Sequence, residues 1–94
     1  MLYVIYCKDN LSTPALRDTF YDAHRAYLKS APINILVAGP YTSTDSDNKI
    51  GSMLVVEAES LEQAEDFQKN DPFALNKVWS EVSVNPYIKA IDQR

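Results

Sequence analysis

The sequence contains few of the residues from which several kinds of site are built. Its 94 residues include one cysteine (Cys7), one histidine (His24) and two glycines (Gly39 and Gly51). One cysteine excludes a disulfide within the chain, and one cysteine with one histidine is too few for a structural zinc site. Two glycines are too few for the glycine-rich loops that bind phosphates or dinucleotides. We therefore expect neither a metal nor a cofactor.

Basic residues and long apolar runs are also scarce. Lys and Arg total 9 against 13 Asp and Glu, the net charge is −4, and no basic cluster occurs. Nucleic-acid binding needs a positive surface, so we expect no nucleic-acid partner. No apolar run approaches the roughly 20 residues of a membrane span, which predicts no membrane association. The start of the chain lacks signal-peptide features, and with a free cysteine this predicts a cytoplasmic protein.

What the sequence does contain is an alternation of strand and helix patterns. Runs rich in β-branched and aromatic residues predict strands at 2–7, 34–38, 53–58 and 82–88. Apolar residues at steps of three and four predict a helix over 14–31; they are Leu16, Phe20, Ala23, Tyr27 and Ala31. A capping box that begins at Ser60 predicts a second helix over 61–70. We interpret 41–50 as a polar loop and 73–78 as a short extra turn.

The order β-α-β-β-α-β predicts a single α+β domain over 1–94 with the ferredoxin-like arrangement. In that fold, both helices cover one face of a four-stranded antiparallel sheet, and the other face should be polar. The strands at 2–7 and 53–56 are apolar on both faces. An open apolar sheet face is unusual on a monomer, so we expect a homodimer through the sheet, and possible higher oligomers are left open. The alternative is that loops and the C-terminal tail cover this face.

His24 is the candidate for acid–base chemistry, because imidazole changes charge near neutral pH. Arg17 lies seven residues earlier on nearly the same line of the helix, and Tyr21 flanks both. Asp71 is the candidate partner that would hold the imidazole tautomer, since both helices pack on the same sheet face. Gly39 and Pro40 could line the same pocket. The structural alternatives are a buried core histidine, an Asp71 that only caps a helix, and a plain strand-ending turn at Gly39-Pro40.

These features occur in an order that resembles the YciI-like family (YCII-related domain). The matching segments are Met1 to Tyr6, Arg17 with His24, Ala38-Gly39-Pro40, Gly51-Ser52, Ser60 to Ala64, Asp71-Pro72-Phe73 and Val82 to Tyr87. The resemblance implies a dimeric α+β barrel protein with an active site at His24 and Asp71. One branch of the family resembles a dehydrochlorinase of a chlorinated hydroxyhydroquinone, and distant relatives include muconolactone isomerase. Two positions depart from the family: Tyr21 stands where many relatives carry Arg, and Arg25 where Leu is frequent.

Three functions follow as alternatives. The first is a small cofactor-independent enzyme in which His24 and Asp71 act as an acid–base pair on a small, anionic or phenolic ring, in a lyase-like or isomerase-like reaction. Arg17 would hold substrate charge, Tyr21 would donate a hydrogen bond, and Gly39 and Pro40 would line the site. The second is a non-catalytic dimer that binds a small molecule. The third is a cofactor-independent oxygenase of the dimeric α+β barrel type.

Overall fold

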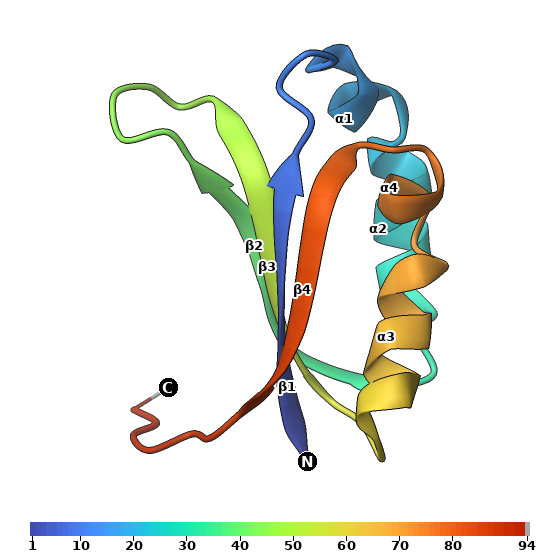
Figure 1. Cartoon of the computed structure of the whole chain (residues 1–94), viewed down its shortest axis with the longest axis vertical. Coiled ribbons are helices and arrows are strands. Elements are labelled where there is room, and N and C mark those ends of the chain that lie inside the picture. The colour runs from blue at the N-terminus through green and yellow to red at the C-terminus, as the bar shows by residue number, and fades with distance from the viewer. Residues whose placement is uncertain (94) are drawn as a thin grey trace.

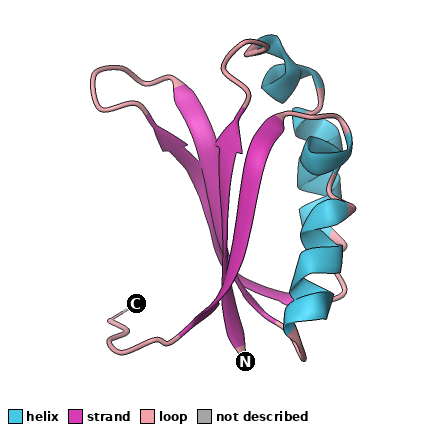
Figure 2. Ribbon diagram, in the orientation of Figure 1, coloured by secondary structure: helices cyan, strands magenta, loops and turns pink. Residues whose placement is uncertain are grey.

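The computed structural model describes residues 1–93. Its elements are β1 (Leu2–Asp9), α1 (Ala15–Thr19), α2 (Tyr21–Lys29), β2 (Asn34–Thr42), β3 (Lys49–Glu57), α3 (Leu61–Lys69), α4 (Pro72–Leu75) and β4 (Trp79–Tyr87). The strands form one sheet, and the helices form a layer on one side of it (Figure 1), with little regular structure outside these two layers (Figure 2). This is the predicted ferredoxin-like α+β arrangement. Within the described part of the chain, no helix is both long and apolar enough to cross a membrane.

The sheet has the strand order β2-β3-β1-β4, and all three neighbouring pairs are antiparallel. β1 and β2 extend beyond their predicted ends, whereas β3 and β4 begin earlier than predicted and end one residue sooner. Gly39 and Pro40 lie inside β2 and do not end it, which shortens the predicted loop over 41–50 to residues 43–48. Pro40 is tolerated there because β2 is an edge strand, where a missing N–H need not break the ladder. Pro86 lies in β4, at the opposite edge, for the same reason.

The predicted helix over 14–31 is wrong in one respect, because it is broken into α1 and α2 at Phe20. Phe20 has φ −104° and ψ 9°, which ends α1 and precedes the first residue of α2. In the predicted apolar stripe, Leu16, Phe20, Tyr27 and Ala31 do pack against the core, and one position is wrong. Ala23 is exposed and His24 is buried. The helical segment therefore presents His24 to the interior of the protein.

Two caps fix the second helical region. The Ser60 hydroxyl accepts from the Gln63 N–H (3.1 Å), and the Gln63 side chain accepts from the N–H of Glu59 (2.7 Å), one residue before the cap. The second cap is Asp71, whose carboxylate accepts from the Phe73 N–H (2.8 Å) at the start of α4. The predicted extra turn is therefore a helical turn that begins at Pro72.

The hydrophobic core lies between the sheet and the helices. Alternate residues of β1 and β3 point toward the helices, as the period of two in a strand requires. They pack against aromatic residues from α3, α4 and the start of β4; the main members are Tyr3, Ile5, Cys7, Leu54, Val56, Phe67, Phe73 and Trp79.

The opposite face of the sheet keeps much of its apolar surface exposed. Tyr6, Val37, Met53 and Tyr87 are each 38–42% exposed. The C-terminal tail runs out on the side of the sheet away from the helices (Figure 1). It does not bury its own apolar side chains, since Ile88 is 87% exposed. The expected second apolar face is therefore present. The tail residues Lys89 and Ile91 border a pocket on this face together with Val37 and Met53, which remain 41% and 38% exposed.

Gly51 is held in a tight space on this open face. It pairs directly with Tyr41 of β2, whose hydroxyl donates to the Cys7 carbonyl oxygen (2.8 Å). The Tyr41 ring also stacks on Tyr6, with ring centroids 5.0 Å apart. A Cβ atom at Gly51 would collide with both the Tyr41 ring and the Cys7 carbonyl oxygen, whereas at Gly39 it would meet nothing within 4 Å. Only glycine at position 51 lets this ring lie flat on the sheet.

We expect Gly51→Ala to lower the free energy of unfolding by about 1–3 kcal/mol, because the Tyr41 ring and the β1 backbone must both give way. Urea unfolding followed by circular dichroism measures this. The matched control is Gly39→Ala, which we expect to change stability by no more than about 0.5 kcal/mol. Equal stability of the two variants would contradict the role assigned to Gly51.

Candidate functional site

His24 and Asp71 meet between α2 and the start of α4, as expected from their shared side of the sheet. His24 Nδ1 lies 2.7 Å from Asp71 Oδ1 and 2.9 Å from Oδ2. Both residues are buried, with 7% of His24 and 1% of Asp71 exposed. An ionised carboxylate can only accept, so Nδ1 carries the proton, and the other ring nitrogen, Nε2, has a free lone pair when the imidazole is neutral. The contact therefore fixes the tautomer of His24 and leaves Nε2 able to accept a proton.

Aromatic rings fix the orientation of the imidazole. The His24 ring stacks on Phe73 with centroids 3.9 Å apart and an interplanar angle of 3°. Trp79 contacts the same ring edge-on, at 6.0 Å and 84°. Asp71 is fixed as well, because its Oδ1 also accepts from the Phe73 N–H. The pair therefore has little freedom to rotate, which lowers the reorganisation that proton transfer requires.

A second buried charge pair lies beside the first. Arg17 donates from Nε and Nη2 to the two carboxylate oxygens of Asp9, at 2.7 and 2.8 Å, and from Nη2 to the Ser52 hydroxyl at 2.9 Å. Its guanidinium carbon is 5.0 Å from the Phe73 ring centroid. Sequence reasoning did not single out Asp9. The alternation of β1 could have found it, because Asp9 is in phase with the buried Ile5 and Cys7 and so points toward the helices.

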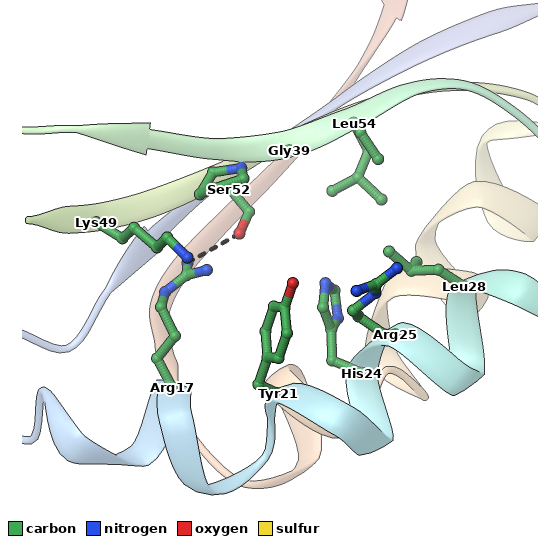
Figure 3. Close-up of a pocket in the computed structure, with 11 residues that line it drawn as sticks. Arg17, Tyr21, His24, Arg25, Leu28, Gly39, Lys49, Ser52 and Leu54 are labelled. Carbon is green, nitrogen blue, oxygen red and sulfur yellow. Dashed lines mark hydrogen bonds between the residues drawn. The ribbon is translucent and has the colours of Figure 1, made fainter. Parts of the chain in front are cut away.

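The two pairs border a pocket of about 250 Å³ between α2 and the sheet (Figure 3). Tyr21 and His24 point from the helix toward the sheet, where Ser52 and Leu54 lie (Figure 3). The lining residues are Arg17, Tyr21, His24, Arg25, Leu28, Ala38, Gly39, Pro40, Lys49, Ser52 and Leu54. Five of the six predicted site residues are thus part of the lining. The sixth, Asp71, does not line the pocket but contacts Nδ1 of His24, which does.

Sequence reasoning gave no role to two charged lining residues, Arg25 and Lys49. The Arg25 guanidinium carbon lies 5.8 Å, and the Lys49 Nζ 5.5 Å, from the centroid of the Tyr21 ring. Lys49 fell in the segment predicted as loop, and the structure makes it the first residue of β3. No carboxylate lines the pocket. The site therefore combines a histidine, a tyrosine hydroxyl and several cations, which suits acid–base chemistry on an electron-rich or anionic molecule.

Cys7 does not supply a nucleophile to this site. Burial raises the pKa of its thiol far above the ordinary value, and the negative charges of Asp71 and Asp9 raise it further. The thiol therefore stays protonated at neutral pH and behaves as a small core side chain. Among residues 1–93, no three His, Cys, Asp or Glu side chains gather closely enough to hold a metal ion.

Solved structures share this fold. One is the 5-chloro-2-hydroxyhydroquinone dehydrochlorinase TftG of Burkholderia phenoliruptrix AC1100, solved in complex with 2,5-dihydroxybenzoquinone. It is 36% identical to this chain, with a TM-score of 0.82 and 94% of each chain covered. Another is SnoaB of Streptomyces nogalater, a cofactor-independent oxygenase, with 13% identity, a TM-score of 0.58, and 98% of this chain and 96% of that chain covered. The second likeness concerns the fold alone.

Two curated relatives match over nearly their whole length. Protein YciI of Escherichia coli is 35% identical over 96 residues, which span 95% of this chain and 98% of the relative. An uncharacterized protein of Haemophilus influenzae is 32% identical over the same shares of both chains. The model of the YCII-related domain matches residues 1–88. Because this match and the two relatives extend over almost the entire sequence, the chain belongs to the YCII-related domain family.

Proposed function

We propose that this protein is a small cofactor-independent enzyme in which His24 and Asp71 form the acid–base pair. The observation that carries the proposal is the contact of 2.7 Å between His24 Nδ1 and the buried Asp71 carboxylate. With its proton on Nδ1, the imidazole can accept a substrate proton at Nε2. Asp71 then stabilises the imidazolium that forms.

The substrate we propose is a small oxygenated ring. A cavity of about 250 Å³ lies at the small end of ligand pockets and has room for one such ring. The similarity to a dehydrochlorinase at 36% identity favours an elimination. In that reaction His24 removes a proton from a ring hydroxyl, and the ring carbon that carries chlorine takes up a proton to give the keto form. Loss of a second hydroxyl proton then expels chloride with the electron pair of its bond to carbon, which leaves a quinone, so that the net loss is one proton and one chloride. An isomerisation would use the same pair, with His24 returning the proton to a different atom.

The remaining lining residues have supporting roles in this proposal. The Tyr21 hydroxyl makes no hydrogen bond within residues 1–93 and lies beside His24 (Figure 3), so it is available to donate to a substrate oxygen. Arg17 was expected to hold substrate charge. Asp9 already balances its charge, so we assign it to donating a hydrogen bond and to holding Ser52 in place. Gly39 and Pro40 form an edge of the pocket without a bulky side chain.

We further propose that the active unit is a homodimer formed through the open sheet face. The support is the exposed apolar surface on β1, β2 and β3, where Tyr6, Val37 and Met53 lie together on neighbouring strands. A second copy packed on the sheet would also bury more apolar surface, which matters because a chain of this length alone buries only about 60–65% of its unfolded surface.

For the acid–base pair we expect His24→Gln to lower kcat by roughly 10²–10⁴, because the proton acceptor is lost. Asp71→Asn should lower kcat over a similar range while KM changes little, since its amide oxygen can still cap α4 but the stabilising charge is gone. The measurement is chloride release from 5-chloro-2-hydroxyhydroquinone without oxygen, with thermal unfolding as the check that each variant is folded.

Three results would count against the acid–base assignment. A folded His24→Gln variant that turns over within a few-fold of the wild type excludes His24 as the base. Ligand binding by the wild-type protein without chloride release favours the non-catalytic alternative. Turnover that occurs only in the presence of oxygen, with oxygen consumed, favours the oxygenase alternative.

For the dimer we expect the wild-type protein to sediment at about twice its monomer mass of 10.6 kDa. Met53→Lys should shift it toward the monomer, because a buried, unpaired ammonium opposes sheet-to-sheet contact. The control is Asp66→Lys on α3, which makes a larger charge change on the helix layer and should remain dimeric. A monomeric wild-type protein, or an unaffected Met53→Lys variant, would refute the proposed interface.

A further inference from the structure

The pocket has a charge pattern that the proposed acid–base chemistry does not use. Its lining includes four side chains that carry or can take a positive charge, namely Arg17, His24, Arg25 and Lys49, and it includes no carboxylate. The chain as a whole has a net charge of −4. Cations are thus concentrated at one site of an acidic protein, and such a concentration attracts anions.

Two of the four cations already have buried partners. Asp9 balances Arg17 and Asp71 pairs with His24, and both contacts are 2.7 Å long. By contrast, Arg25 and Lys49 form no ion pair with any residue in the described range 1–93. Both are exposed at the pocket. The positive charge of the site that no ion pair neutralises therefore belongs to Arg25 and to Lys49, which also borders a second pocket lined by Asp18, Asp45 and Asp47.

These two cations come from different elements and contact the same ring. Arg25 extends from α2 beside His24, and Lys49 extends from the first residue of β3 on the other side of the pocket (Figure 3). Their charged groups lie 5.8 and 5.5 Å from the centroid of Tyr21. An exposed cation–π contact is worth only about 0.5–1 kcal/mol. Both side chains can therefore turn from the ring toward an incoming anion at small cost.

We propose that Arg25 and Lys49 form an anion-binding entrance to the pocket, and that the ligand of this site carries a carboxylate. The inference rests on the proposed function and adds a carboxylate to the ring substrate of the same site, a group that the chlorinated hydroxyhydroquinone used above as a probe lacks. A carboxylate fits because a guanidinium can donate two parallel N–H bonds to its oxygens, while the ammonium adds a point charge. Because Arg25 follows His24 directly, a carboxylate bound there leaves the ring of a small acid within reach of the imidazole.

The test compares benzoate with benzamide, which has nearly the same shape and no charge, by titration calorimetry at low ionic strength. We expect benzoate to bind more tightly than benzamide. Arg25→Gln and Lys49→Gln should each weaken benzoate binding by roughly 5–10-fold, which is what the loss of one hydrogen bond at an exposed site produces. Benzamide binding should change by less than about twofold. Both substituted residues are exposed, so the variants should fold normally.

One control separates this inference from others. Lys69→Gln makes the same charge change on α3, away from the pocket, and should leave benzoate binding unchanged. The two proposals also fail separately, because benzoate binding is measured without turnover: loss of turnover in His24→Gln bears on the acid–base role, and loss of benzoate binding in Arg25→Gln and Lys49→Gln bears on the anion entrance. The inference is overturned by equal affinity for benzoate and benzamide, by unchanged binding in both Gln variants, or by a wild-type protein that does not bind benzoate at about 10 mM.

Discussion

The arrangement of the helical layer depends on one buried carboxylate. Asp71 is 1% exposed and accepts from two directions, from His24 Nδ1 on α2 and from the backbone N–H of Phe73 on α4. A buried charge is tolerated only where it is paired and hydrogen-bonded, so these donors are what allow Asp71 to lie inside. The same bonds join α2 to α4 and place Phe73 flat against the imidazole. Helix capping and orientation of His24 are therefore two consequences of one side chain.

The pair of Arg17 and Asp9 also shows that a buried charge needs a partner, and this limits which charges in the site can bind a ligand. Arg17 is buried because Asp9 and Ser52 accept its hydrogen bonds. Removing either member of such a pair would leave a buried charge without a partner, a change that costs about 3–5 kcal/mol. The hydrogen bonds and charge of Arg17 are consequently used within the folded structure. Charge that a ligand can use must therefore come from lining side chains that form no ion pair within residues 1–93, which are Arg25 and Lys49.

The sequence patterns were sufficient for the fold, because the period of two in the strands and the order of the elements leave few alternatives. The meeting of His24 and Asp71 was also predictable, since both helices must cover one sheet face. The break at Phe20 was not, because an apolar periodicity continues through it. His24 is not one of the five residues of the predicted apolar stripe, and it is buried because pairing with Asp71 makes its burial favourable. Asp9 was missed because its partner, Arg17, lies on another element, where spacing along one helix gives no signal.

The pocket and the open face share the strand β3, and the alternation of that strand links them. Ser52 and Leu54 point toward the helices and line the pocket, while Met53 and Val55 point to the open face. A strand cannot shift in register or twist without moving both sets, since successive side chains are fixed to one backbone. Packing a second copy against Met53 would therefore restrain the backbone that positions Ser52, and through its hydroxyl the guanidinium of Arg17. Association through the sheet, as proposed above, would therefore both complete the core and stiffen the wall of the pocket that faces His24.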